Sequence, residues 1–127
     1  MMYNKIVEEC FFYPKHVGVI DTAKPYSVCC SGNLLNQGVQ VALYLECSPD
    51  HVIESARFKA TGNPYVIAAL EWLCRQIEGR DFRQLPTIDY QVLVKVLEIP
   101  QPMYALSIHL IDIYQQALAL MVKKFKG

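Results

Sequence analysis

Residues 39–60 read VQVALYLECSPDHVIESARFKA and carry two strand patterns separated by a turn. In residues 39–47 every odd position is apolar, which is the period of a strand with one buried face. Ser48-Pro49-Asp50 is typical of a tight turn. In residues 52–60 the even positions would share one face and the odd positions, beginning with Ile53, the other. This stretch therefore predicts two adjacent antiparallel strands.

A third strand precedes these two. Residues 26–30 have a composition that suits a strand, and Ser31-Gly32-Asn33 then predicts the start of a loop that reaches Gly38. Three strands in series indicate an antiparallel meander, because short connections can join only antiparallel neighbours.

Helical patterns lie on both sides of the predicted sheet. Residues 3–12 favour a short helix that ends at the following Tyr-Pro pair, and residues 66–77 repeat apolar side chains at helical spacing. Residues 89–98 predict a shorter helix, and residues 106–121 predict a long amphipathic one. This order predicts an α+β fold, in which helices pack on one face of a three-stranded antiparallel sheet, within a single domain over residues 1–127.

Composition excludes several classes of protein. Apolar residues make up 53% of the chain and charged residues 19%, which favours a packed core over disorder. Basic and acidic residues balance, and the one basic cluster lies at residues 123–126, so we expect no nucleic-acid partner. Polar residues interrupt the apolar stretch 106–122, which argues against a membrane span. The N-terminus has no long apolar run, which predicts a cytoplasmic protein.

The chain contains five cysteines, an odd number at irregular spacing, which predicts reduced thiols rather than a disulfide framework. Cys10 and Cys74 lie on the apolar stripes of predicted helices and should be core residues. Cys47 ends a strand before a turn, which predicts partial exposure. Cys29 and Cys30 are the only adjacent pair, and on a strand their side chains would point to opposite faces.

The chain has three histidines, and only one of them is a candidate ligand. His16 and His51 occupy predicted turns and are expected to face solvent. His109 lies three residues after Leu106 on the predicted long helix, so it is the histidine best placed for a ligand role. The sequence has no phosphate-binding loop, metalloprotease motif or nucleophile elbow, so it predicts no catalytic residue and no enzyme activity.

Several short motifs resemble the IscU/NifU-type iron–sulfur scaffold family and keep its register without an insertion. They begin with Pro14 and Val17-Gly18, continue with IESARFK at residues 53–59, and include Gly62 followed by Ile67-Ala68. The same register extends through Gly79, Glu98, Pro100, Ser107-Ile108 and Asp112. The resemblance covers nearly the whole chain and implies the fold of that family.

In that family, three cysteine thiolates with an aspartate or histidine hold a [2Fe–2S] cluster, and zinc is the other metal that the family implies. Carried across residue by residue, the resemblance places these ligands at Gln37, Val39, Asn63, Ala105 and Leu106. None of these side chains is a thiolate, a carboxylate or an imidazole. We therefore expect no cluster and no zinc, and no acceptance of persulfide sulfur at these positions.

Three functions stay open at this point. The first is a pseudo-scaffold that carries no cluster but docks or regulates partners, such as a cysteine desulfurase or another iron–sulfur assembly factor. The second is an iron or iron–sulfur carrier with a relocated site built from Cys29 or Cys30 and His109. The third is an unrelated protein-interaction module on the same fold, including a homo-oligomer formed through the surface near the family's ligand positions.

Overall fold

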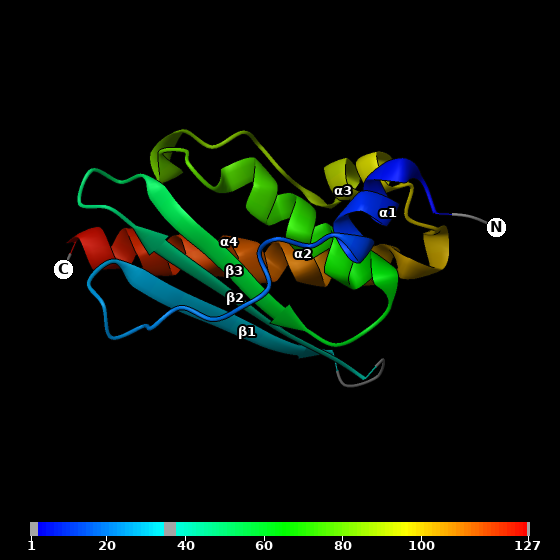
Figure 1. Ribbon diagram of the computed structural model, residues 1–127, viewed down its shortest axis with the longest axis horizontal. Coiled ribbons are helices and arrows are strands. Elements are labelled where there is room, and N and C mark those ends of the chain that lie inside the picture. Colours follow the sequence, from blue (N-terminus) through cyan, green and yellow to red (C-terminus); the bar gives the residue numbers. More distant parts are fainter. Residues whose placement is uncertain (1–2, 35–37, 127) are drawn as a thin grey trace.

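The computed structural model describes residues 3–34 and 38–126, which form one sheet with helices on it. In chain order the elements are α1 (Lys5–Phe12), β1 (Ser27–Leu34), β2 (Val39–Cys47), β3 (Ile53–Ala60), α2 (Pro64–Ile77), α3 (Tyr90–Leu97) and α4 (Tyr104–Lys126), with two 3-10 turns, η2 (Phe82–Gln84) and η3 (Gln101–Met103). The predicted α+β fold, with an N-terminal helix and a long C-terminal helix, is confirmed (Figure 1).

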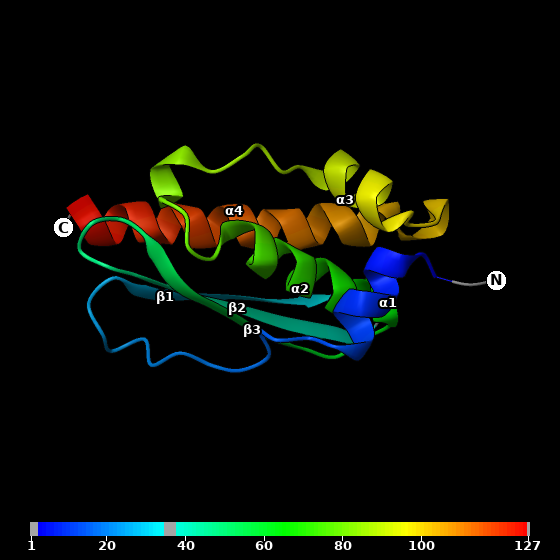
Figure 2. The ribbon, with the colours of Figure 1, turned by 45° about the horizontal axis from the view of Figure 1, so that its top comes forward.

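The strands form an antiparallel sheet in the order β1-β2-β3, and α2 and α4 cover one face of it (Figure 2). Along the central strand, Leu43 and Leu45 are fully buried and Val41 is 3% exposed. Removing each of these side chains from water contributes roughly 1.5–3 kcal/mol. The alternation seen in the sequence therefore marks the face on which the helices pack.

Strand β1 is longer than predicted. Ser31, Gly32 and Asn33 continue the strand to Leu34, and Gly32 pairs with Val41 of β2. A Cβ atom on Gly32 would lie 2.6 Å from Ile113 Cδ1 of α4, so the glycine marks a close approach of strand to helix. The prediction of a loop after residue 30 was wrong because this contact joins residues far apart in sequence.

The start of β3 also differs from the prediction. An irregularity between Glu46 and Cys47 places Ile53 opposite Cys47 and Ser55 opposite Glu46. Ile53 is consequently fully buried although it was assigned to the face opposite Phe58, which is also buried. Cys47, expected to be partly exposed, is 5% exposed because it lies beside Ile53 in the same core.

Residues 13–19, called the strap below, follow α1 and run along the free edge of β3. Val17 forms a bridge with Phe58. The Gly18 N–H donates to the Phe58 carbonyl at 2.9 Å, and the Phe58 N–H donates to the His16 carbonyl at 2.9 Å. The strap therefore covers an edge that would otherwise expose unpaired backbone groups.

Helix α4 with its preceding turn, Gln101–Lys126, is long and apolar enough by length and composition to cross a membrane. Its inner face is buried against the sheet and the other helices. The buried residues are Leu106, Ser107, Leu110, Ile113, Tyr114, Ala117 and Met121. A helix that packs one face into the core of a protein can have the same length and apolar composition, so these two properties are weak evidence for a membrane span here.

The close approach of β1 to α4 predicts that Gly32→Ala destabilises the protein. The added Cβ atom would lie 2.6 Å from Cδ1 and 3.1 Å from Cγ1 of Ile113, so the helix side chain must move. We expect the free energy of unfolding, measured by urea denaturation, to fall by about 1–3 kcal/mol. Ser31→Ala, an exposed neighbour on the same strand, should change it by less than about 0.5 kcal/mol. Equal losses in both variants would contradict the close approach.

Candidate functional site

The positions that the resemblance assigns to cluster ligands lie toward one end of the molecule. Val39 begins β2, Asn63 precedes α2, and Ala105 and Leu106 lie in the first turn of α4. Figure 1 shows the starts of these three elements toward the end that also holds α1 and the N-terminus. Gln37 lies outside the described residues.

Two of these positions hold packed apolar side chains. Val39 and Leu106 are each 2% exposed. A Cβ atom built on Gly62 would lie 3.2 Å from Val39 Cγ2 and 3.3 Å from Val66 Cγ2. The φ angle of Gly62 is +137°, a conformation that favours glycine, so the loop before α2 passes directly over these two valines. Apolar contact therefore fills the space between the start of β2 and the start of α2.

Asn63 has a structural role at the start of α2. Its Oδ1 atom accepts hydrogen bonds from the N–H groups of Tyr65 at 2.9 Å and Val66 at 3.3 Å. These N–H groups have no partner within the helix, and an N-cap asparagine satisfies them. The side-chain oxygen of Asn63, its only potential metal ligand, therefore already has two hydrogen-bond donors.

The donors present do not fit a [2Fe–2S] cluster or zinc. Iron in such clusters is held by thiolates or imidazoles, and structural zinc takes thiolate, imidazole or carboxylate ligands. The four described positions offer two apolar side chains in the core, an exposed alanine and the capping amide. Within residues 3–34 and 38–126 no group of three His, Cys, Asp or Glu side chains lies close enough to hold a metal ion.

Burial also disfavours the ionised form of the five thiols in the metal-free chain. Burial raises the pKa of Cys10, Cys29, Cys30, Cys47 and Cys74, and that of Cys47 reaches about 12. The thiolate is the form that binds metal and attacks sulfur. At neutral pH these cysteines are therefore protonated, as expected for small apolar core residues.

The structure does not bring together the residues predicted for a relocated site. The Cys30 Sγ atom donates to Gln116 Oε1 of α4 at 3.5 Å. His109 is exposed and lies seven residues before Gln116, which is roughly 10 Å along the helix axis. Cys29 is paired with Tyr44 and lies on the other face of the sheet from Cys30, as predicted.

Comparison with known proteins identifies the family of the chain. The sequence model described as the NifU-like N-terminal domain matches residues 2–127. The chain belongs to this family. A search of curated protein sequences finds no match.

Solved structures have the same fold as this NifU-like chain. A crystal structure of a NifU-like protein (N-terminal) from Brucella abortus is 15% identical, with a TM-score of 0.63, and the match covers 97% of this chain and 93% of that one. A protein from Fervidobacterium islandicum, named as a candidate iron–sulfur cluster assembly scaffold of the SUF system, is 17% identical with a TM-score of 0.64, covering 93% and 94%. The family resemblance found in the sequence is thus confirmed.

The strap of this NifU-like chain contains a buried histidine, so the prediction that His16 faces solvent was wrong. His16 is 8% exposed. Its Nδ1 atom lies 2.7 Å from Glu71 Oε2, and its Nε2 atom lies 3.0 Å from Glu78 Oε1. An ionised carboxylate can only accept hydrogen bonds, so both contacts are made when both ring nitrogens carry hydrogen.

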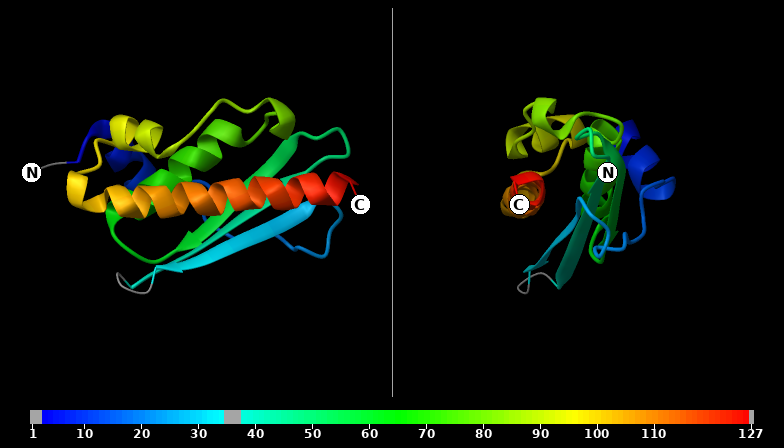
Figure 3. Two further views of the ribbon diagram at one scale, coloured as in Figure 1. Left: turned by 180° about the vertical axis from the view of Figure 1, so that it is seen from behind. Right: turned by 90° about the vertical axis from the view of Figure 1, so that its left-hand side faces the viewer.

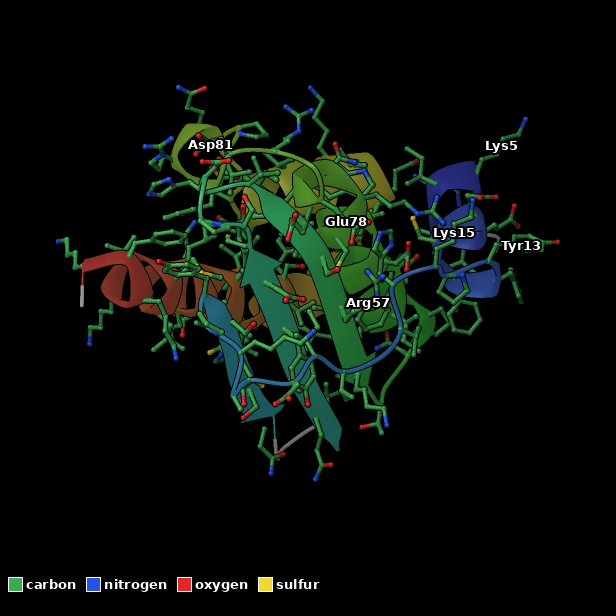
Figure 4. The ribbon with its side chains drawn as sticks, turned by 60° about the vertical axis from the view of Figure 1, so that its left-hand side comes forward. Lys5, Tyr13, Lys15, Arg57, Glu78 and Asp81 are labelled. Atoms are coloured by element: carbon green, nitrogen blue, oxygen red, sulfur yellow. The ribbon has the colours of Figure 1, made fainter. Side chains whose placement is uncertain are left out.

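Glu71 is fully buried at the centre of this ionic network. Its Oε1 atom accepts from the N–H groups of Lys15 and His16, both at 2.9 Å, and its Oε2 atom accepts from Arg75 Nε at 2.7 Å. Glu78 accepts from Arg57 Nη1 at 2.8 Å, and Figure 4 shows these two side chains next to each other. The network therefore joins the strap to α2 and β3.

At both glutamates, hydrogen bonds lower the pKa by more than burial raises it. Burial alone would raise the pKa of Glu71, but hydrogen bonds from Arg75, His16 and the strap backbone lower it below its ordinary value. Burial likewise opposes a lowered pKa at Glu78, and hydrogen bonds from the Ala56 N–H, Arg57 and His16 overcome it. Both oxygens of Glu71 already accept hydrogen bonds, so this network holds the strap in place and offers no free ligand.

His51, also expected to face solvent, is half-buried in an aromatic cluster near the C-terminus. Its ring centroid lies 4.2 Å from that of Phe125, which stacks on Tyr26 at 4.2 Å. The last turn of α4 therefore packs on the turn between β2 and β3.

Sequence reasoning missed the buried His16 and the half-buried His51 because their partners lie far along the chain. For His16, the one available signal is that Glu71 is the sole acidic residue of the 14-residue helix α2.

The lowered pKa values predict how stability depends on pH. Because both carboxyl groups bind protons less readily in the folded than in the unfolded chain, their contribution is complete above the unfolded pKa of roughly 4.3. It is lost as the pH falls through the lower folded pKa of each group. Glu71→Gln should lower the free energy of unfolding at pH 7 by about 3 kcal/mol or more, since it leaves buried donors facing an amide.

Urea denaturation at pH 7 and at acidic pH checks this prediction. The native chain should lose more stability on acidification than Glu71→Gln, which lacks one of the two titrating groups. The control is Glu54→Gln, since Glu54 is exposed on β3. A native chain whose loss on acidification equalled that of Glu71→Gln would contradict the role of Glu71.

Proposed function

We propose that this chain is a pseudo-scaffold of iron–sulfur cluster assembly, which keeps the family fold, carries no cluster and docks or regulates another assembly component such as a cysteine desulfurase. The observation that carries the proposal is the use of the ligand positions for packing and capping. Val39 and Leu106 are buried, and Asn63 caps α2. Side chains with these roles leave a protein frame without the chemistry of a cluster.

The burial of the thiols supports a role in protein docking rather than in sulfur transfer. A thiol that accepts persulfide sulfur has to be accessible and ionised. Four of the cysteines are buried, and Cys29 is half-buried. Burial raises the pKa of each, which favours the protonated thiol over the thiolate that sulfur acceptance requires.

Exposed apolar side chains at the end of α1 and along the strap support protein docking. They are called the α1 patch and consist of Phe12, Tyr13, Val17 and Val19, which are 62%, 66%, 55% and 59% exposed. Figure 4 shows Tyr13 pointing away from the body of the molecule. Clustered exposed apolar side chains mark sites of protein contact more often than single ones do.

The absence of a cluster is tested by reconstitution. Anaerobically purified chain, incubated with ferrous iron and sulfide and then desalted, should stay colourless because the ligand positions lack donors. Its iron and sulfide content should equal that of the triple variant Cys29→Ser, Cys30→Ser and His109→Ala. Visible absorption in the native chain that this variant loses would assign a relocated site and contradict the proposal.

Docking is tested with a cysteine desulfurase from the same cell. The native chain should bind it, and Tyr13→Asp should weaken binding by at least about tenfold, as truncation of an interface anchor does. The matched control is Leu120→Asp, because Leu120 is an exposed apolar residue of α4 outside the α1 patch. Biolayer interferometry measures both. A native chain that bound neither the desulfurase nor the other assembly factors of that cell would contradict docking.

A further inference from the structure

Helix α4 carries a second row of mainly apolar residues on the flank beside its buried row, and two members of this second row, Ile111 and Leu118, pack partly against the core. This row is called the outer stripe and consists of Tyr104, Ile108, Ile111, Gln115, Leu118 and Val122. Its members are separated alternately by four and three residues. That spacing is the 3.5-residue repeat of the seam positions in a two-helix coiled coil.

Four of the six members of the outer stripe are exposed, and Ile111 and Leu118 are half-buried. Tyr104, Ile108 and Val122 are 37%, 49% and 38% exposed. Figure 3 shows α4 running along the outside of the molecule with no other described segment in front of it. The inner row of α4 is fully used by the sheet and the helices, so the exposed members of the outer stripe are the part of α4 left for another contact.

The residue types of the outer stripe indicate a helix as its occupant. Ile108, Gln115 and Val122 occupy one class of seam position, and Tyr104, Ile111 and Leu118 occupy the other. Gln115 is the single polar member, in the same class as Ile108. One polar seam residue is the usual device that fixes register in such a pair. The stripe is about 27 Å long, the length of a five-turn helix.

Charge favours a second copy of α4 in the reverse direction. Asp112 is the only acidic residue of this helix, while Lys123, Lys124 and Lys126 lie in its last turn. Two parallel copies would bring both lysine clusters together. Two antiparallel copies separate them and bring each closer to the half of the partner helix that holds Asp112, which lowers the repulsion.

We propose that two copies of the chain pair through their outer stripes, with the α4 helices antiparallel, to form a two-fold symmetric dimer. Each copy presents the same stripe, so the contact is isologous and closed. A single helix pair is smaller than the about 800 Å² per partner of a standard interface, so a dissociation constant in roughly the micromolar range is expected.

Sedimentation equilibrium over a range of concentrations tests the dimer. Ile108→Glu and Val122→Glu should each raise the dissociation constant by at least about tenfold, and Gln115→Leu should lower it. The matched control is Leu120→Glu, which places the same charge at a 37% exposed position on the other flank of α4 and should leave the constant unchanged. Circular dichroism confirms that each variant is folded.

Cysteine cross-linking tests the direction. In an antiparallel pair, Ile108→Cys should not cross-link to itself but should cross-link to Leu118→Cys or Val122→Cys in a mixture. Self-cross-linking of Ile108→Cys would overturn the antiparallel arrangement. A chain that stayed monomeric, including one that bound phosphatidylcholine vesicles through the stripe, would overturn the proposal. So would a dimer weakened as much by Leu120→Glu as by Ile108→Glu.

Discussion

Coverage of the inner face of β2 is the constraint on which the rest of this structure depends. Leu43 and Leu45 are fully buried, so two helices have to lie across the sheet along its length. The other elements pack around these two helices. Strand β1 approaches α4 closely through Gly32, and the strap is held to α2 by the buried Glu71.

The same constraint explains why the family's ligand end persists without ligands. When α2 and α4 both cross the sheet, their first turns lie toward the same end of the molecule as the start of β2, whatever side chains these turns carry (Figure 1). A ligand at this place has to be an ionised donor, whereas a packing residue has to be apolar and buried. Val39 and Leu106 are apolar and buried, so they serve as packing residues and cannot act as ligands. The fold can therefore be retained when these positions hold packing residues in place of ligands.

The sequence predicts those parts of the fold that depend on local period. The alternation in β2, the helical spacing in α2 and the break at Gly62-Asn63-Pro64 are local, and the observed elements follow them. The family resemblance also predicts which residues occupy the ligand positions. Sequence reasoning fails where a contact between distant residues determines the local structure. Gly32 was assigned to a loop, but it lies in a strand and approaches Ile113 of α4. His16 was expected to be exposed, but its ring is hydrogen-bonded to Glu71, 55 residues later.

The outer stripe begins at the ligand end, where Tyr104 precedes Ala105, and extends away from it along α4, which matters for how a dimer would act. The ligand end lies at the start of α4, and the outer stripe runs along its side. Antiparallel pairing of two α4 helices points their starts in opposite directions. The two α1 patches would then lie at opposite ends of the dimer, each free to contact a partner. Two linked sites bind a multivalent partner more tightly than one, without any new contact at either site. A weak helix pair is therefore sufficient to turn a docking protein into one that bridges two partners.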